Sequence, residues 1–308
     1  MTTRLYSHPA CLSHQAAAGH PERPDRLRAL TRAFANPAFD AVERRQAPRA
    51  SEDDIARAHS KAHIDHVRTT APRSGLARLD ADTYMSPGSW EAAFRGAGAV
   101  VEATRGVLAG EATNAFCAVR PPGHHAEREK AMGFCLLNNV AIAARYARQV
   151  HGLDRVAIVD FDVHHGNGTQ EIFHEDPAVL YASTHQMPLF PGTGSASETG
   201  VGNIFNAPLN AGDGGAEFQD AITSVVLPAL DAFAPQLVII SAGFDAHERD
   251  PLGQLRLSHD DFAWVTRALM SVADTHAGGR VVSVLEGGYD LTSLARSASA
   301  HLATLMTA

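Results

Sequence analysis

The segment VAIVDFDVHHGNG, Val156–Gly168, runs from an apolar stretch directly into a cluster of acidic and imidazole side chains. Its first four residues are apolar, which predicts a buried strand, and Gly166 and Gly168 predict a turn after it. Two aspartates and two histidines therefore sit where a strand ends and a loop begins: Asp160, Asp162, His164 and His165. Ligands of open α/β sheets bind at that end of the strands. The segment thus predicts both an α/β fold and a site within it.

Short apolar runs alternate with longer amphipathic segments along the rest of the chain. The predicted strands are Ala115–Val119, Arg155–Asp160, Val179–Ser183, Gln236–Ser241 and Arg280–Leu285. The predicted helices are Arg23–Phe34, Ser89–Leu108, Asn139–Val150, Glu217–Phe233, Ser258–Thr275 and Leu291–Met306. Ser258 and Asp261 match a capping box, and Gly152 and Gly278 stand where helix C-caps are expected. We expect one α/β domain over residues 1–308, with a mostly parallel sheet covered on both faces and a surface loop at Thr69–Ser89.

The composition is that of a globular protein with a large core. Of 308 residues, 45% are hydrophobic and 19% are charged, which argues against disorder. The formal net charge of −8 disfavours non-specific binding to nucleic acid or to an anionic membrane. The cysteines Cys11, Cys117 and Cys135 form no Cys-x-x-Cys pair, and the first residues contain no apolar secretory core. We therefore expect a cytoplasmic protein without a disulfide framework.

Three other predicted strands are also followed by chemically unusual residues. RPPGHHAE follows the first strand and contains the adjacent His124 and His125. SAGFDAH places Asp245 after the fourth strand, and LEGGYD places Tyr289 after the fifth. Because the carboxyl ends of parallel strands meet at one edge of a sheet, we expect these side chains to converge on one crevice.

Asp162 and His164 are two residues apart, so on an extended backbone their side chains point the same way. Together with Asp245 they offer one imidazole and two carboxylates. Three protein ligands with an open position are typical of a catalytic zinc site. The alternative is that Asp162 and His164 only cap the loop by hydrogen bonds. The four unusual strand ends favour the metal site.

The paired histidines suit proton transfer, because imidazole changes protonation state near neutral pH. Two imidazoles divide the base and acid roles when their surroundings push their pKa values apart. Asp160 is the carboxylate available to orient one histidine, and Asn167 is the neutral partner available in the same loop. Tyr289 follows two glycines that let the backbone approach a ligand, so its phenol is a candidate donor to an oxyanion.

Seven motifs, in this order, resemble those of the zinc-dependent histone deacetylase-like amidohydrolases: GHPERPDR, RPPGHHA, GFCLLNN, DFDVHHGNG, FPGTG, SAGFDAH and LEGGYDL. The resemblance is strongest to the class II type and its bacterial relatives, and it extends from His20 to Leu291. Seven motifs in family order are highly specific. The resemblance implies the arginase–deacetylase fold, in which a parallel sheet of about eight strands lies between helices. This agrees with the α/β prediction.

The resemblance also implies roles for individual residues. They are Asp162, His164 and Asp245 as ligands of one zinc ion; His124, His125, Asp160, Asn167 and Tyr289 in catalysis; Gly133, Phe134 and Phe190 in the acyl-lysine tunnel; and Arg26 in the channel for acetate exit. The family further binds structural potassium. An inner potassium site would use Asp160 and Ser183 with backbone oxygens of Asp162, His164 and Thr184; an outer one would use backbone groups of Phe173, Asp176 and Val179.

Asn167 departs from part of the family, because class I members carry Asp at this position whereas class II members often carry Asn. His125 would therefore lack a carboxylate partner and should be the less basic of the two histidines. This makes His125 the predicted base that activates water. His165 is expected to face away from the site and to be structural.

The expected activity is zinc-dependent hydrolysis of the amide of an N-acetylated amine, with N6-acetyllysine in proteins or peptides as the expected substrate. The closest alternative is an acetylpolyamine amidohydrolase, although the loop insertion of that type is not found before Tyr84. A two-manganese ureohydrolase would need anionic ligands where this chain has His165 and Asn167. A catalytically inactive binding module would not need the complete metal and acid–base set. The physiological substrate, the acyl length and the oligomeric state are left open.

Overall fold

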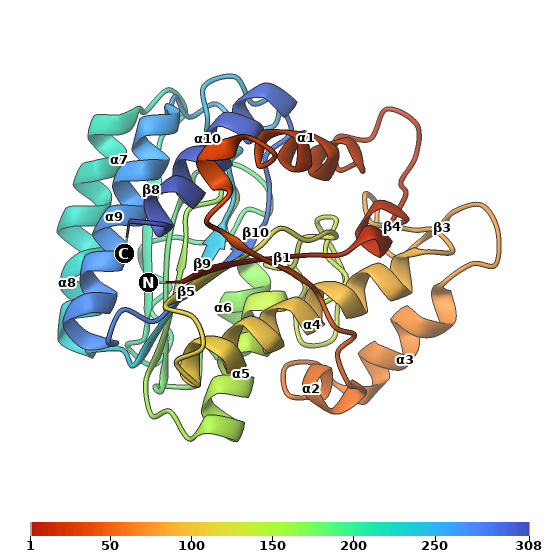
Figure 1. The fold of residues 1–308 in the computed structure, drawn as a ribbon, viewed down its shortest axis with the longest axis horizontal. Helices are drawn as coiled ribbons and strands as arrows, with labels where there is room; N and C mark the ends of the chain where they lie inside the picture. Colours follow the sequence, from red (N-terminus) through yellow and green to blue (C-terminus); the bar gives the residue numbers. More distant parts are fainter. Residues whose placement is uncertain (1, 308) are drawn as a thin grey trace.

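A parallel sheet of eight strands lies at the centre of the computed structural model, which describes residues 2–307 (Figure 1). The strands are β1 (Thr3–Ser7), β2 (Glu43–Gln46), β5 (Asn114–Cys117), β6 (Val156–Asp160), β7 (Val179–Gln186), β8 (Ile204–Leu209), β9 (Leu237–Ala242) and β10 (Val281–Leu285). Across the sheet their order is β2-β1-β5-β10-β9-β6-β7-β8, and all neighbouring pairs are parallel. The predicted α/β fold is confirmed. A short antiparallel pair, β3 (Ala77–Arg78) and β4 (Tyr84–Met85), forms a separate sheet.

Helices cover both faces of this sheet, as Figure 1 shows. One group consists of α1 (Asp25–Ala33), α7 (Gly215–Ala221), α8 (Leu227–Phe233), α9 (His259–His276) and α10 (Leu291–Leu305). The other consists of α4 (Ser89–Leu108) and α5 (Asn139–His151), with α2 (Glu52–Ala56) and α3 (Lys61–Thr70) beside them and α6 (Asn167–Phe173) against α5 and β7. None of the helices within residues 2–307 is long and apolar enough to cross a bilayer.

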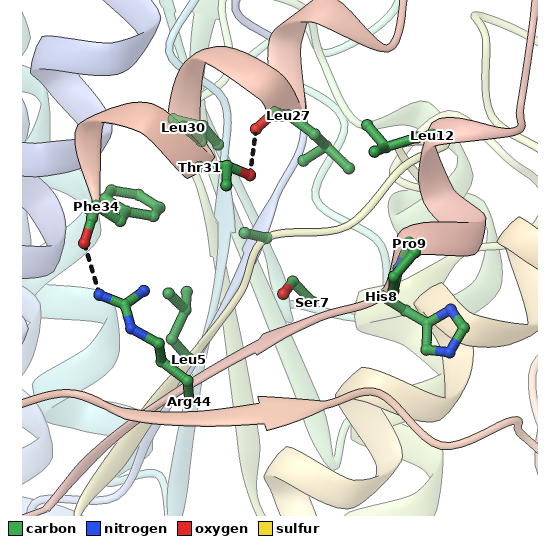
Figure 2. Close-up of a pocket in the computed structure, with 11 residues that line it drawn as sticks. Leu5, Ser7, His8, Pro9, Leu12, Leu27, Leu30, Thr31, Phe34 and Arg44 are labelled. Carbon is green, nitrogen blue, oxygen red and sulfur yellow. Dashed lines mark hydrogen bonds between the residues drawn. The ribbon is translucent and has the colours of Figure 1, made fainter.

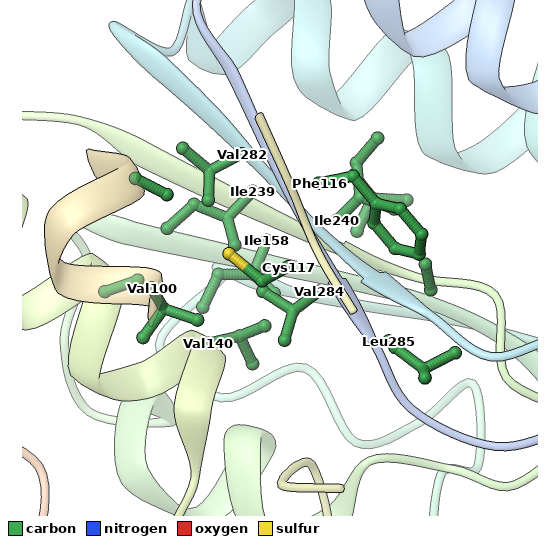
Figure 3. Packing of buried hydrophobic residues seen from close by; sticks show 14 of the residues in the cluster. Val100, Phe116, Cys117, Val140, Ile158, Ile239, Ile240, Val282, Val284 and Leu285 are labelled. Atoms are coloured by element: carbon green, nitrogen blue, oxygen red, sulfur yellow. The ribbon is translucent and has the colours of Figure 1, made fainter. Parts of the chain in front are cut away.

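The central strands are apolar on both faces because helices cover both sides. Successive side chains of a strand point to opposite faces, and Figure 3 shows the result. Val282 and Val284 of β10 lie on the side of Val100 of α4 and Val140 of α5, and Phe116 of β5 lies on the other side. Each large apolar side chain buried in this way stabilises the fold by roughly 1.5–3 kcal/mol. The sheet therefore holds the loops at its carboxyl edge in fixed positions.

All five predicted strands are present, and β7 continues to Gln186 instead of ending at Ser183. Strands β1, β2 and β8 were not predicted. β2 and β8 lie at the two edges of the sheet, where one side of a strand needs no ladder partner and polar residues or a proline are tolerated. The sequence ERRQ of β2 and Pro208 within β8 fit that position. The search for apolar runs therefore misses edge strands, and it also missed β1, an inner strand whose sequence TRLYS contains no continuous apolar run.

The helix predictions need smaller corrections. α4 begins and ends as predicted, whereas the predicted helix Glu217–Phe233 begins at Gly215 and passes through a π-helical turn at Ile222–Val226. The capping box of Ser258 is present, and Gly152 caps α5 in the left-handed conformation. Thr69–Ser89 was wrong as a plain surface loop, because it contains β3, β4 and the fully buried Met85. The short helices α2, α3 and α6 were not predicted.

Candidate active site

The four strands whose ends carry unusual chemistry are neighbours in the sheet. β5, β10, β9 and β6 lie side by side and run in the same direction, so the loops that follow them emerge at one edge. In that order, the loops carry His124, Tyr289, Asp245 and Asp162. The expected convergence on one crevice is confirmed by this topology.

Asp162, His164 and Asp245 form a buried group whose candidate ligand atoms all lie within 4.8 Å of one another. The Nδ1 atom of His164 is 3.1 Å from Oδ1 of Asp162 and 3.2 Å from Oδ2 of Asp245. Backbone donors hold the carboxylates in place: the amide of Gly287 donates to Asp162 at 2.8 Å, and that of Val163 donates to Asp245 at 2.9 Å. A side chain at Gly287 would collide with both carboxylates, so this position requires glycine.

Two buried carboxylates in contact with one imidazole create a demand for positive charge. Burial and the neighbouring Asp162 carboxylate raise the pKa of Asp245 to about 7. Burial alone would lower the pKa of His164, but its hydrogen bonds to Asp162 and Asp245 raise that pKa to about 10. A cation held between the three side chains would stabilise both carboxylates in their charged form. One imidazole nitrogen and two carboxylate oxygens also match the ligands of catalytic zinc, so these residues fit the metal.

His124 is backed by a carboxylate. Its Nδ1 atom lies 2.9 Å from Oδ2 of Asp160, which also accepts a hydrogen bond from the hydroxyl of Tyr181 at 3.1 Å. Burial alone would lower the pKa of His124, but the carboxylates of Asp160 and Asp162 raise it to about 10. The imidazole is therefore held in its protonated form.

His125 is backed by an amide. Its Nδ1 atom lies 2.9 Å from Oδ1 of Asn167, and its ring centroid is 4.0 Å from that of His124. Burial lowers the pKa of His125 well below its usual value, and the neighbouring His124 and His164 lower it further. The two adjacent imidazoles thus differ in basicity in the direction that the sequence predicts.

A pocket of about 250 Å³ leads to these groups, and the three residues predicted for the tunnel, Gly133, Phe134 and Phe190, all line it. The ring of Phe190 packs on His125 with centroids 5.1 Å apart, and the ring of Phe134 packs on Tyr289 with centroids 5.9 Å apart. Gly133 has a φ of +56°, and a side chain there would collide with the ring of His125. Sequence reasoning missed three further lining residues: Asp82, Leu189 and Leu252.

Tyr289 forms one wall of this pocket. Its backbone amide donates to the carboxylate of Asp250 at 2.6 Å, and the guanidinium of Arg26 lies 4.9 Å from the centroid of its ring. Burial raises the pKa of Tyr289 well above its usual value, so the phenol keeps its proton and can donate a hydrogen bond. Arg26, predicted for the exit channel, is fully buried behind Tyr289 and donates to the carbonyl of Gly288 at 2.6 Å.

Two buried acids support the site and were given no role in the sequence analysis. The carboxylate of Glu286 accepts from the backbone amide of His124 at 3.2 Å and so ties the loop of the histidines to the end of β10. Glu22 lies between the guanidinium groups of Arg26 and Arg120. Both acids belong to quoted motifs, but Glu286 bonds to the backbone of another loop and Glu22 pairs with Arg120, 98 residues further along the chain, as well as with the nearby Arg26. Motif spacing does not reveal the two distant contacts.

The residues expected at the inner potassium site are close to the candidate metal ligands. Asp160 and Ser183 are paired in register across β6 and β7, and both are fully buried. The backbone amide of Asp162 donates to Oδ1 of Asp160 at 3.1 Å. A carboxylate at the end of β6 and a buried hydroxyl opposite it within β7 are compatible with a cation.

The residues expected at the outer potassium site give a different result. The carbonyl oxygens of Phe173, Asp176 and Val179 do converge, at distances of 2.8, 3.0 and 2.8 Å from one atom. That atom is the side-chain nitrogen Nδ2 of Asn203, which was not predicted to lie there. The three carbonyls therefore already have a hydrogen-bond donor at their centre, and they do not fit a cation.

His165 points away from the pocket, as expected. Its Nδ1 atom lies 2.8 Å from the hydroxyl of Thr193, and its Nε2 atom lies 3.0 Å from Oε1 of Gln170. Both ring nitrogens thus have partners, so His165 does not offer a ligand to a second metal beside Asp162.

A second pocket, of about 260 Å³, lies between α1 and β1 (Figure 2). Its walls are largely apolar side chains, and its polar groups bond to the surrounding backbone: Arg44 donates to the carbonyl of Phe34 at 2.5 Å, and Thr31 donates to that of Leu27 at 2.8 Å. None of the predicted site residues lines it. The chemistry of the molecule is concentrated in the other pocket, at the carboxyl edge of the sheet.

Comparisons with known proteins agree with this geometry. The family model for the histone deacetylase domain matches residues 20–305. A histone deacetylase-like amidohydrolase of Pseudomonas aeruginosa is 42% identical over 280 residues, which cover 89% of this chain and 73% of that protein. A probable deacetylase of Archaeoglobus fulgidus is 38% identical over 298 residues, covering 94% and 82%. The crystal structure of the HDA15 HD domain matches with a TM-score of 0.94 at 39% identity, covering 99% of this chain and 90% of that one. The chain therefore belongs to the histone deacetylase family and has the arginase–deacetylase fold.

Proposed function

We propose that residues 1–308 form one catalytic domain, a zinc-dependent deacetylase that hydrolyses the amide of N-acetylated amines and releases acetate. The observation that carries this proposal is the buried group of Asp162, His164 and Asp245 beside an aromatic-walled pocket. Its test is acetate release from an acetyllysine peptide by zinc-loaded protein, measured before and after chelation. If fully zinc-loaded protein released no acetate from acetylated lysines or acetylated polyamines, the proposal would be wrong.

Asp162, His164 and Asp245 would hold one zinc ion per chain, which when bound would polarise the acyl carbonyl and lower the pKa of water towards ~7. The carboxylates of Asp162 and Asp245 are buried, are held by backbone donors and require a positive charge beside them, which supports this assignment. Three protein ligands also leave a position open for water or substrate.

The two histidines would divide the proton transfers. His125 has the lowered pKa and is the unprotonated group, so it accepts the proton of the attacking water. His124 has the raised pKa and carries a proton, so it donates to the leaving amine. Asp160 keeps His124 charged through the hydrogen bond to its Nδ1 atom.

Tyr289 would stabilise the oxyanion that develops from the acyl carbonyl. It lines the pocket, retains its phenolic proton and is fixed by Asp250 at its backbone and by Phe134 and Arg26 at its ring. A donor held in place before the reaction favours the transition state over the substrate. Arg26, immediately behind the ring, would line the exit path of acetate.

The substrate that the pocket supports best is N6-acetyllysine in a protein or peptide. Phe134 and Phe190 with Leu189 and Leu252 give the pocket apolar walls for a butyl chain. Asp82, also in the lining, is the observation that favours the second candidate, an acetylated polyamine, because its carboxylate would attract a second amine. The ratio of kcat/KM for acetyllysine peptides to that for acetylpolyamines decides between the two. A ratio below one would contradict the lysine assignment.

We further propose one structural potassium ion at the inner site. Asp160 and Ser183 would supply side-chain oxygens, with backbone oxygens of Asp162, His164 and Thr184. The support is that Asp160 and Ser183 are buried register partners adjacent to these backbone positions. An ion there would fix the loop that carries the zinc ligands.

A further inference from the structure

Behind His125 the hydrogen bonds continue through Asn167 to a second acid. Oδ1 of Asn167 faces Nδ1 of His125 at 2.9 Å, and Nδ2 of Asn167 donates to Oε1 of Glu127 at 2.9 Å. Glu127 is half-buried and comes from the loop just after the two histidines. We propose that Glu127 is a positioning residue that sets the tautomer of His125; this rests on the proposed role of His125 as the base.

The orientation of an amide side chain is ambiguous. The side chain of Asn167 can turn either its oxygen or its NH₂ group towards His125, whereas the carboxylate of Glu127 can only accept. Glu127 therefore binds the NH₂ group and turns the oxygen of Asn167 to His125. The Nδ1 atom of His125 must then carry the hydrogen, which leaves Nε2 free to accept a proton from water.

Without Glu127, the reversed amide would donate to Nδ1 of His125. The hydrogen would then sit on Nε2, and the imidazole would be the wrong tautomer for a base. His124 has no such requirement, because the carboxylate of Asp160 accepts from it directly in either orientation. The tautomer of His125 thus depends on two residues behind it, Asn167 and Glu127, whereas that of His124 depends on Asp160 alone.

The first test reads the tautomer directly. Nitrogen-15 NMR of the His125 ring in the zinc-loaded protein should show hydrogen on Nδ1 in the wild type and a mixture in Glu127→Ala. Glu127→Gln should also give a mixture, because its amide can either accept from or donate to Asn167 and so does not fix the orientation of that side chain. Turnover should fall about 10–100-fold in Glu127→Ala with KM little changed, the usual cost of losing a group that orients a functional imidazole. Glu171 of α6 lines the same cavity as Glu127 and Asn167, and Glu171→Ala is the control that should change neither measurement.

The second test uses Asn167→Asp. A carboxylate at this position needs no orienting partner and is repelled by Glu127. Adding Glu127→Ala to Asn167→Asp should therefore leave kcat unchanged or raise it, whereas Glu127→Ala alone lowers it. An equal loss in both backgrounds, or an unchanged His125 spectrum in Glu127→Ala, would overturn the proposal. The spectrum does not depend on turnover, so an inactive protein would refute the deacetylase assignment and leave the tautomer result standing.

An independent observation concerns Asn203, which immediately precedes β8. Its Nδ2 atom donates to the carbonyls of Phe173, Asp176 and Val179, and its Oδ1 atom accepts from the backbone amide of Val201 at 3.2 Å. Asn203 is itself buried. The geometry points to Asn203 as a built-in replacement for the outer monovalent cation that the family resemblance implies.

A cation at this point and the amide of Asn203 would need the same three oxygens, so one excludes the other. The surroundings are also already positive: Arg148 contacts the carboxylate of Asp176 at 2.9 Å, and Arg145 donates to the carbonyl of Ile172 at 3.2 Å. The two N–H groups of the amide are shared among three carbonyls and join the end of α6 to the start of β7. The side chain thereby does the cross-linking that an ion would do.

Thallium(I), which replaces potassium and is located by anomalous diffraction, tests this directly. Crystals of the wild type grown in thallium should show no peak among the three carbonyls, whereas Asn203→Ala should show one. In tetramethylammonium chloride, Asn203→Ala should lower Tm by about 2–5 °C, and potassium should restore part of the loss. Asn206→Ala, at another buried asparagine, is the control and should add no potassium dependence. A thallium peak in the wild type with the amide displaced, or an unchanged Tm in Asn203→Ala without potassium, would overturn the assignment.

Discussion

The side of the sheet at which its strands begin (the amino edge) and the side at which they end (the carboxyl edge) carry similar ion pairs in different surroundings. At the amino edge, Arg4 pairs with Glu43 at 2.8 Å and Arg105 pairs with Glu111 at 2.7 Å, with both glutamates partly exposed. At the carboxyl edge, Glu22 pairs with Arg26 at 3.1 Å and with Arg120, and all three side chains are 0–1% exposed.

The difference is one of desolvation. An exposed pair gains little, because water and salt screen it and two long side chains lose freedom. A buried pair has lost its hydration, so removing one partner leaves an uncompensated charge. Charges are retained inside the carboxyl edge although apolar residues would pack there at no such cost. We therefore infer that they position the site, whereas the amino edge is a solvated surface.

Removal of the proposed metal should have the largest effect. Chelation is expected to reduce deacetylation to the background rate, and zinc or cobalt should restore it, because Asp162, His164 and Asp245 form a single buried ligand group. Metal content and initial rate are measured on the same samples. Full activity in rigorously metal-free protein would contradict the metal assignment, and the carboxyl edge would then not be distinguished from the amino edge by a catalytic metal.

Glu22→Gln tests the buried pair itself. The change keeps the shape but leaves the guanidinium groups of Arg26 and Arg120 without their counter-charge, so the free energy of unfolding should fall by about 3–5 kcal/mol. Urea denaturation measures it. If the free energy of unfolding fell no more than it does when an exposed ion pair is removed, burial would not explain the difference between the amino and carboxyl edges.

Tyr289→Phe should lower kcat ~10²–10³-fold, the effect of losing one oxyanion donor, equivalent to about 2.7–4 kcal/mol of barrier. The volume is nearly unchanged, and Tyr289 is not a proposed ligand, so zinc content and Tm should stay close to the wild-type values. KM should change much less than kcat, because the bond strengthens mainly in the transition state. Wild-type kcat in a folded, zinc-loaded Tyr289→Phe protein would show that the phenol has only a structural role.

How far the sequence predicts these features depends on where the partners of each residue lie. The proposed ligands Asp162 and His164 follow an apolar strand at close spacing, so their proximity is evident from the sequence. The roles of Glu22 and Glu127 depend on contacts between loops that only the folded chain brings together. Asn203 is the clearest case, because three backbone carbonyls carry no signal in the sequence. A separate reason applies to the strands, because β2, with the sequence ERRQ, lacks the apolar run by which the five predicted strands were recognised.

His301 extends the comparison to the helix-covered face of the sheet. Burial lowers its pKa to about 3, and its ring nitrogens contact the hydroxyls of Thr266 and Ser283 at 2.6 and 2.8 Å. Because the pKa is lowered by folding, the unfolded chain binds a proton that the folded chain does not, and stability is lost as pH falls below the unfolded value of ~6.5. From pH 7 to pH 5 this one group should cost about 2 kcal/mol. His301→Gln should reduce the pH slope of the free energy of unfolding by nearly one proton, and an unchanged slope would contradict the assignment.

The smallest effect is expected at the amino edge. Glu111 contacts both Arg105 and Arg4, yet it is partly exposed, so water already screens most of the attraction. Glu111→Gln should therefore change Tm by about 1 °C or less, and 1 M salt should abolish the difference, because the Debye length there is ~3 Å. Calorimetry of both proteins at low and high salt measures this. Each of these glutamates pairs with two arginines, so the geometry of the ion pairs is similar at the amino and carboxyl edges. If Glu111→Gln lost as much stability as Glu22→Gln, the geometry of the pairs and not their burial would determine their contribution to stability. A Tm change that is negligible and disappears in salt would mean that burial makes the ion pairs of the carboxyl edge important for stability.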